Sequence, residues 1–334
     1  MDKITYRDAG VDLQKAEEFV NYIKEKVKGL SSGVLLWGGF SSGLKIEGYK
    51  DPVIMMSTDG VGTKLKVAQA VGIHDTIGID LVAMNVNDVL TSGADPIAFL
   101  DYIATGMIDL DVLKKVIDGI VEGCKRAGVP LVGGETAQMP DFYPDGVYDL
   151  AGFCVGVCEK SHLLTGEEIK EGDLLIGLPS SGFHSNGYSL IRKVLTQKGI
   201  GYDDRLSEFG KRVYELLLEP TRIYVEDVKK LKTKVRIKGM AHITGGGIRG
   251  NLVRILPEGK RAIVKKSLIP KQEIFDWIRR LGNIEEEEMY RTFNMGMGFV
   301  IIVEEREVQK VIDLIKDAFV CGHIEEGKRD VLLV

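Results

Sequence analysis

The sequence predicts an α+β protein built from two halves. Each half mixes candidate strands and helices without the strict alternation that a doubly wound parallel sheet requires. The chain has 334 residues, roughly twice the ~150 residues of an average domain, which favours two domains. A polar stretch at residues 159–172 separates the halves, and we place the domains at residues 1–165 and 166–334.

The first half is predicted to begin with an amphipathic helix at residues 13–27, where apolar residues recur at helical spacing and Asp12 can cap the first turn. Further helices are expected up to Val71, at residues 76–92 and at residues 111–127, with Gly72 and Gly128 after two of them. Strands are predicted at residues 53–56, 96–104, 129–132 and 149–157, and 96–104 is apolar enough to be buried on both faces.

The second half is predicted to open with a strand at residues 173–178 and a helix that ends near Lys198. Other helices are expected near residues 208–218 and 223–231, and the acidic run 285–288 is expected to start a solvated helix. The remaining strand candidates are residues 235–241, the region of Ile263, and residues 298–303 and 331–334.

Composition and charge exclude several classes of protein. Hydrophobic residues make up 44% of the chain and charged residues 28%, which is typical of a globular protein. The net charge is −5 and basic residues form no long run, so no nucleic-acid surface is expected. Glycine is frequent, at 40 residues, which indicates tight turns and backbone that approaches ligands.

The sequence carries no recognisable signal for secretion or membrane insertion. The first residues lack the apolar core of a signal peptide, and the apolar runs are far shorter than the ~20 residues of a membrane-spanning helix. We therefore predict a soluble, cytoplasmic protein without a membrane partner. The cysteines lack metal-ligand spacing and are predicted to be buried, reduced thiols: Cys124, Cys154, Cys158 and Cys321.

The stretch TDGVGTK, at residues 58–64, is the first candidate for chemistry. It places Asp59 at a predicted strand end, then two glycines, and then Lys64 where a helix begins. Asp59 could hold a divalent cation and Lys64 could supply a charge to phosphate. An ordinary turn in which Asp59 caps the helix fits the pattern equally well.

The predicted helix at residues 76–92 is apolar on almost every side, which is typical of a buried helix. Asp88 shares a stripe with Ile77, Leu81 and Met84. A carboxylate buried there is costly unless it is paired with a cation. We favour a functional carboxylate over a structural ion pair, which is the alternative.

Four further segments combine glycine with polar residues. The loop at residues 38–43 could close over a phosphate chain, and Glu135 follows two glycines in a predicted strand-end turn. Two loops in the second half place His184 and His242 before helices, whose first N–H groups bind anions. For either histidine alone, a structural role is the alternative, and the turn at residues 244–247 suits a phosphate monoester.

These motifs together resemble phosphoribosylformylglycinamidine cyclo-ligases, the AIR synthetase family. The residues that carry the resemblance are TYRDAGVD (5–12), TDGVGTK (58–64), HDTIGIDLVAMNVND (74–88), GGETAQMP (133–140), SSGFHSNGYSL (180–190), AHITGGG (241–247) and MYRTFNMGMG (289–298). The residues from Asp88 to Pro96 also match the family's ATP-site signature, DxxxxGAxP. The match runs from residue 5 to about residue 300.

The resemblance implies a fold and an activity. The N-terminal domain would pair across a homodimer into a β-barrel, and a C-terminal α/β domain would pack beside it. The enzyme would use ATP and Mg²⁺ to close formylglycinamidine ribonucleotide to aminoimidazole ribonucleotide, the fifth step of de novo purine synthesis. A K⁺ requirement is left open, and a nucleotide-binding regulator or a small-molecule kinase on the same fold are the alternatives.

The resemblance also implies a set of site residues. Four would be catalytic, with the first and third also holding Mg²⁺: Asp59, Lys64, Asp88 and His184. ATP would be bound by Gly38, Gly39, Phe40, Gly60, Gly62, Thr63, Asn87, Gly93, Ala94 and Glu135. The ribonucleotide would be bound by Ser185, Asn186, His242, Thr244, Gly245, Gly246 and Gly247.

Overall fold

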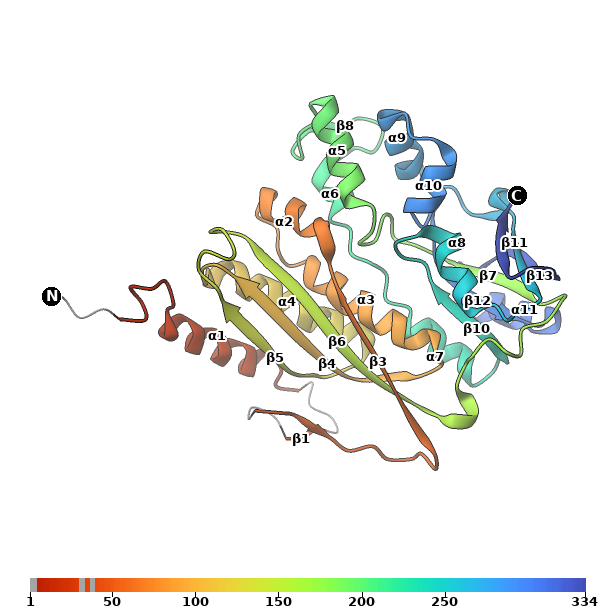
Figure 1. The fold of residues 1–334 in the computed structure, drawn as a ribbon, viewed down its shortest axis with the longest axis horizontal. Helices are drawn as coiled ribbons and strands as arrows, with labels where there is room; N and C mark the ends of the chain where they lie inside the picture. The colour runs from red at the N-terminus through yellow and green to blue at the C-terminus, as the bar shows by residue number, and fades with distance from the viewer. Residues whose placement is uncertain (1–4, 30–33, 37–39) are drawn as a thin grey trace.

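The computed structural model describes residues 5–29, 34–36 and 40–334. The chain forms two α+β halves, each with its own main sheet (Figure 1). The α+β prediction is therefore confirmed. Gly38 and Gly39, expected in a loop that closes on ATP, lie outside the described residues.

The first half is a four-stranded sheet with helices on one face. Its strands run in the order β3-β6-β4-β5; β4 and β5 are parallel, and the other neighbours are antiparallel. Its elements are α1 (Leu13–Lys26), β1 (Val34–Leu36), β2 (Gly43–Leu44), β3 (Pro52–Gly60), α2 (Leu65–Val71), α3 (Ile77–Thr91), β4 (Asp95–Thr105), α4 (Leu110–Ala127), β5 (Leu131–Gln138) and β6 (Tyr148–Glu159).

Local signals placed these helices correctly. The Asp12 carboxylate accepts hydrogen bonds from the N–H groups of Gln14 and Lys15 at the start of α1. Gly72 and Gly128 end α2 and α4 in the left-handed conformation, which glycine adopts without strain.

The second half is a six-stranded sheet in the order β10-β12-β7-β13-β11-β14, antiparallel throughout except between β11 and β14. Its strands are β7 (Leu174–Pro179), β10 (Ile237–His242), β11 (Lys260–Val264), β12 (Met297–Val303), β13 (Phe319–Glu326) and β14 (Asp330–Leu333). Its helices are α5 (Tyr188–Lys198), α6 (Val213–Leu217), α7 (Val225–Lys232), α8 (Gly247–Leu252), α9 (Glu273–Gly282), α10 (Glu286–Thr292) and α11 (Val308–Leu314).

Several predicted elements differ from the structure. Glu135 does not sit in a strand-end turn, because β5 continues through it to Gln138 along the edge of β4. The helix expected from residue 208 begins only at Val213; before it, β8 (Arg205–Leu206) pairs with β9 (Lys211–Arg212) in a short hairpin. β13, α9 and α11 had no corresponding prediction from the sequence.

One face of the first sheet is only partly covered. In β4 the predicted burial on both faces holds for most residues, and Tyr102 is the exposed exception. Helices α3 and α4 cover one face only. Along the other face, four large apolar side chains are 36–63% exposed. These residues, which we call the open face, are Ile54, Met56, Tyr102 and Phe153.

The cysteine prediction is confirmed. All four thiols are buried and none forms a disulfide in the part of the chain that the structure describes. Burial raises the pKa of Cys154 and Cys321 to about 12, so both stay protonated at neutral pH. Among the described residues, no helix combines the length and the apolar character needed to cross a bilayer.

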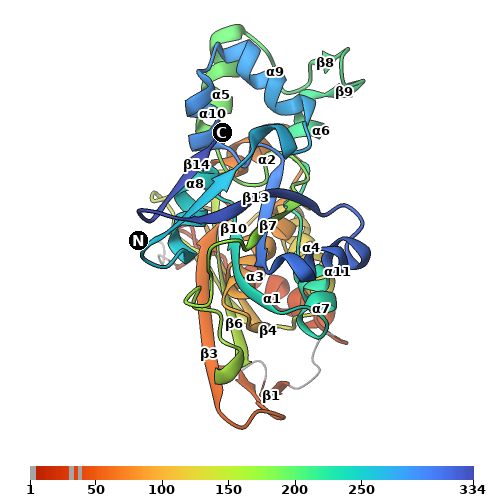
Figure 2. The same ribbon diagram turned by 90° about the vertical axis from the view of Figure 1, so that its right-hand side faces the viewer.

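The two halves meet along α3. This helix packs against its own sheet and also against β10 and α7 of the second half. Figure 2 shows α3 directly beside these elements. Nearly every residue of α3 is buried, as its all-round apolar sequence predicts.

Candidate active site between the two halves

Lys64 forms a fully buried ion pair between the halves. It follows β3, its side chain is 0% exposed, and its Nζ lies 2.8 Å from Asp80 Oδ2. Nζ also donates to the carbonyl oxygens of His184, at 3.1 Å, and Glu219, at 2.7 Å. Protein acceptors therefore surround its ammonium group in this geometry, and the role of Lys64 as a phosphate ligand stays a prediction.

Asp80, which the sequence analysis did not select, is the partner of Lys64. Its Oδ1 accepts from the Thr221 N–H at 2.7 Å, the Thr221 hydroxyl at 2.6 Å and the Ser185 hydroxyl at 3.2 Å. Ser185, predicted to bind substrate, instead belongs to this buried network. The signal that could have found Asp80 is its place on an all-apolar helix, 16 residues after Lys64.

Asn87 is a second link between the halves. Its Nδ2 donates to the Arg222 carbonyl at 2.9 Å, and its Oδ1 accepts from the Tyr224 N–H at 3.0 Å. Both ends of the amide are thus used within the protein. Asn87 thus joins α3 to the segment before α7, and its contact with ATP stays a prediction.

Asp88 is not buried among apolar residues, as its stripe on the helix had suggested. Its side chain is 41% exposed, and its Oδ1 lies 2.8 Å from Nδ1 of His242, whose side chain is 1% exposed. The Asp88–His242 pair therefore connects the end of α3 to the end of β10.

Asp59 completes a cluster with Asp88 and His242. Burial raises the pKa of Asp59, and the negative charge of Asp88 raises it further, while the Gly60 N–H and His242 lower it. Asp59 Oδ1 accepts from the Gly60 N–H at 2.8 Å, and the 3₁₀ turn Gly62–Lys64 that follows has no side-chain cap. The alternative in which Asp59 is a helix cap is therefore not supported.

The donor set of this cluster suits Mg²⁺. Two neighbouring carboxylates repel unless a cation lies between them. Mg²⁺ usually takes one or two carboxylates and completes its shell with water and substrate phosphates. The described residues contain no group of three His, Cys, Asp or Glu side chains that could hold a metal alone. Asp59 and Asp88 thus fit a metal that arrives with a nucleotide.

His184 lies on the second half's side of the cluster. Its backbone φ is +58°, its side chain is buried, and its Nε2 accepts from the Ser181 N–H at 3.1 Å. Burial lowers the pKa of His184 well below its usual value, and the nearby His242, Lys64 and Arg222 lower it further. The ring is therefore neutral. A Cβ on Gly298, in β12, would lie 2.5 Å from the His184 ring. Only glycine at this position leaves room for the ring.

The turn at residues 244–247 lies beside the His184 loop, since a Cβ on Gly245 would be 3.3 Å from Asn186 Oδ1. Asn251 Nδ2 donates to the carbonyls of Thr244, Gly245 and Gly247 at 2.8–3.3 Å. With its carbonyls held in this way, the turn can present the N–H groups of Gly245 and Gly246 to an anion. The Thr244 hydroxyl donates to Asn251 Oδ1, so it is already used.

Gly60, Gly62 and Thr63 lie next to Asp59. Gly60 ends β3, where a Cβ would be 2.9 Å from the Leu150 carbonyl, and Gly62 has a φ of +72°. The Thr63 hydroxyl lies 2.9 Å from the Ser189 hydroxyl in α5. The glycines therefore let the chain turn tightly from β3 toward the second half.

The other described residues that were predicted to bind ATP are spread over three further places. Glu135 is in register with Tyr102, so its side chain lies on the open face. Asp59 points from the other side of the sheet. Gly93 and Ala94 form the tight turn after α3, where a Cβ on Gly93 would be 2.8 Å from the His162 carbonyl. Phe40 is fully exposed. A single chain therefore does not bring Glu135 to Asp59, because the sheet separates the two side chains.

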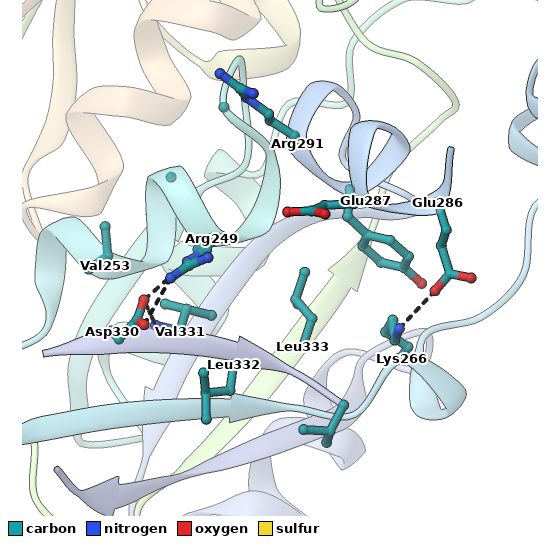
Figure 3. Close-up of a pocket in the computed structure, with 14 residues that line it drawn as sticks. Arg249, Val253, Lys266, Glu286, Glu287, Arg291, Asp330, Val331, Leu332 and Leu333 are labelled. Carbon is teal, nitrogen blue, oxygen red and sulfur yellow. Dashed lines mark hydrogen bonds and ion pairs between the residues drawn. The ribbon is translucent and has the colours of Figure 1, made fainter. Parts of the chain in front are cut away.

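A separate cavity of about 1020 Å³ adjoins the turn at residues 244–247, and Gly246 belongs to both (Figure 3). Strand β14 forms one wall, and α8 and α10 form the others. Two of its three cationic side chains, Arg249 and Lys266, pair with Asp330 and Glu286, both at distances below 3 Å. Asp59, Asp88 and His242 do not line this cavity.

Family models match both halves of the chain. Residues 14–158 match the family model "AIR synthase related protein, N-terminal domain", and residues 170–334 match the corresponding C-terminal domain. The phosphoribosylformylglycinamidine cyclo-ligase of Caldanaerobacter subterraneus subsp. tengcongensis is 51% identical over 98% of this chain and 99% of its own length. The cyclo-ligase of Myxococcus xanthus is 48% identical over 99% and 98%.

Solved structures share the fold at low sequence identity. Thiamine-monophosphate kinase from Stenotrophomonas maltophilia has a TM-score of 0.68 at 16% identity, covering 93% of this chain and 95% of its own. The hydrogenase maturation protein HypE in complex with ATP has a TM-score of 0.66 at 16% identity, covering 94% and 88%. Because both domain models and full-length relatives at about half identity match, the chain belongs to the phosphoribosylformylglycinamidine cyclo-ligase family of AIR synthase related proteins.

Proposed function

We propose that this chain uses ATP to close formylglycinamidine ribonucleotide to 5-aminoimidazole ribonucleotide, with release of ADP and phosphate. The observation that carries the proposal is the meeting of Asp59 and Asp88 with His184 and His242 between the halves. The full-length similarity to cyclo-ligases supports the choice of reaction.

The reaction divides into two steps. The amide oxygen of the substrate attacks the γ-phosphorus of ATP and ADP leaves, which gives an iminophosphate. The tethered nitrogen then attacks the activated carbon, the C–O bond breaks, and phosphate departs with the amide oxygen. Because both groups belong to one molecule, the protein mainly positions them and stabilises charge on the phosphoryl oxygens.

Asp59 and Asp88 would hold Mg²⁺, which neutralises phosphate charge when it is bound. Asp88 keeps one carboxylate oxygen for the metal, because only its Oδ1 contacts His242. Gly60, Gly62 and Thr63 border the same place and would contact the ATP phosphates. Replacing K⁺ with Na⁺ in the activity assay decides whether a monovalent cation takes part.

The second half would bind the ribonucleotide, and the first half would bind ATP, with the domains divided near residue 165. The N–H groups of Gly245 and Gly246 would bind the 5′-phosphate. Asn186 and His242 lie beside that turn, and each carries a buried nitrogen without a partner among the described residues. Those nitrogens would contact polar atoms of the substrate.

The first half would also form a homodimer, in the cytoplasm. The open face is the surface that a second copy would cover, because its four large apolar side chains remain exposed in a single chain. Glu135 lies on this face, so it can serve an ATP site only where two copies meet. In sedimentation, wild type should be a dimer and Met56→Glu a monomer, while Leu268→Glu, at an exposed apolar residue of the second half, should stay dimeric. A monomeric wild type contradicts the dimer.

The test of the proposed reaction is the balance of its products. Incubation with ATP, Mg²⁺ and the ribonucleotide should give ADP, phosphate and the aminoimidazole in equal amounts. A kinase, which is the alternative on this fold, would leave the phosphate on its product and release none. Release of phosphate without the ribonucleotide would also contradict the proposal.

A further inference from the structure

His184 has one ring nitrogen with a partner and one without. Nε2 accepts from the Ser181 backbone N–H, which can only donate. A neutral imidazole has one donor nitrogen and one acceptor nitrogen, so the proton of this ring is on Nδ1. Nδ1 is buried and has no hydrogen-bond partner among the residues that the structure describes.

The surroundings of the ring keep it neutral. Lys64, Arg222 and His242 are the titratable groups that act on it, and all of them disfavour an added positive charge. The centroid of the Tyr224 ring lies 6.4 Å from that of His184, and the backbone of Gly298 packs beside the His184 ring. No carboxylate contacts the ring in the described part of the chain, so His184 lacks the partner that a proton-transferring histidine commonly has.

The conformation of His184 is costly, and the protein holds it from two sides. A positive φ is unfavourable for a non-glycine residue. A buried N–H without an acceptor adds a further cost, because it has lost its hydrogen bond to water. Lys64 holds the carbonyl of His184, and the Ser181 N–H holds its ring. Strain held in this way is typical of residues that act on a ligand.

We propose that neutral His184 donates a hydrogen bond from Nδ1 to an oxygen of the phosphoryl group that is transferred to the substrate. No proton changes place in this role, because Nδ1–H of a neutral imidazole is far too weak an acid to release it. The donor is instead fixed toward the oxygens on which negative charge is greatest during transfer. Nδ1 is closed off from solvent, so the segments around it must part when substrates bind.

This assignment rests on the proposed function, and two substitutions separate it from acid–base catalysis. In His184→Asn, the side-chain amide nitrogen takes the place of Nδ1, and asparagine tolerates a positive φ. In His184→Gln, the terminal group takes the place of Nε2 and leaves no donor at Nδ1. We expect His184→Asn to keep at least about ten times the kcat of His184→Gln, since one such donor is worth roughly 100-fold or more.

The pH–rate profile should be the same in wild type and His184→Asn. A kcat of His184→Gln equal to or above that of His184→Asn overturns the assignment, and so does a lost limb of the pH–rate profile in His184→Asn. If wild type itself makes no aminoimidazole, the proposed function fails instead.

A measurement on the unmodified protein covers the case in which a variant does not fold. Nitrogen NMR of histidine-labelled wild type should show His184 with the proton on Nδ1, unchanged from about pH 5.5 to 8.5. A proton on Nε2, or a titration within that range, overturns the assignment whatever the enzyme's activity.

Discussion

Replacing Lys64 with methionine separates its buried structural role from the phosphate role that its sequence motif suggests. Methionine keeps much of the length of lysine and removes the charge, so Asp80 is left buried without its cation. Removing one partner of a buried ion pair typically costs about 3–5 kcal/mol. The carbonyls of His184 and Glu219 also lose a donor, at about 1 kcal/mol each.

Other contacts reduce this loss. Thr221 and Ser185 still donate to Asp80, so we expect Lys64→Met to lower the free energy of unfolding by about 4 kcal/mol. Such a loss is a large part of the ~5–15 kcal/mol that stabilises a typical domain. In the double variant Lys64→Met/Asp80→Asn no charge is buried and the amide oxygen still accepts from Thr221, so we expect it to regain about half of the loss.

Urea unfolding followed by circular dichroism measures these differences. Lys114→Met is the matched control, because Lys114 pairs with Glu18 at the surface, and its loss should cost under about 1 kcal/mol. The reasoning is refuted if Lys64→Met unfolds like wild type and only its KM for ATP rises. That result would restore Lys64 as a phosphate ligand.

Three other predictions concern single residues. Burial raises the pKa of Asp101 from 3.8 to about 7, so near neutral pH the folded state binds a proton that the unfolded state has lost. The free energy of unfolding should therefore fall by up to roughly 4 kcal/mol between about pH 4 and pH 7. Thermal unfolding of Asp101→Asn should not show this pH dependence. Gly246→Ala, at a φ of +94° where a Cβ would lie 3.7 Å from Gly250 Cα, should raise the KM for the ribonucleotide about 10-fold or more and leave the KM for ATP nearly unchanged; an equal rise in both contradicts the phosphate site. Asp88→Asn should lose turnover and the thermal stabilisation by Mg²⁺ and ATP without lowering the stability of the protein alone; a loss of several kcal/mol would instead make Asp88 a structural partner of His242.

The sequence was informative where a local pattern decides the outcome. The cap at Asp12 and the glycines after α2 and α4 were predictable because their signals lie within one turn of the helix. The motifs around Asp59, Asp88 and His242 also identified side chains that the structure brings together.

The sequence was less informative where packing between distant segments decides the outcome. Which of Asp80 and Asp88 is buried depends on segments that lie more than 100 residues further along the chain. Thr221, which donates to Asp80, and the Glu219 carbonyl, which accepts from Lys64, belong to such a segment. The apolar pattern of β4 predicted that both faces of its sheet are covered. A single chain supplies helices for only one of these faces. Glu135 was assigned to a turn because its two preceding glycines are typical of turns, whereas pairing with β4 holds them in a strand.

The central claim is that the substrate's amide oxygen attacks ATP at the site between the halves, and an isotope experiment tests it most directly. The ribonucleotide is prepared with a heavy oxygen isotope in its formyl amide and converted by the wild-type enzyme with ATP and Mg²⁺. If the amide oxygen is phosphorylated and then expelled, each phosphate released carries one heavy oxygen. Unlabelled phosphate, with the heavy oxygen found in water, would contradict the account, because ATP cleavage would then not activate the amide.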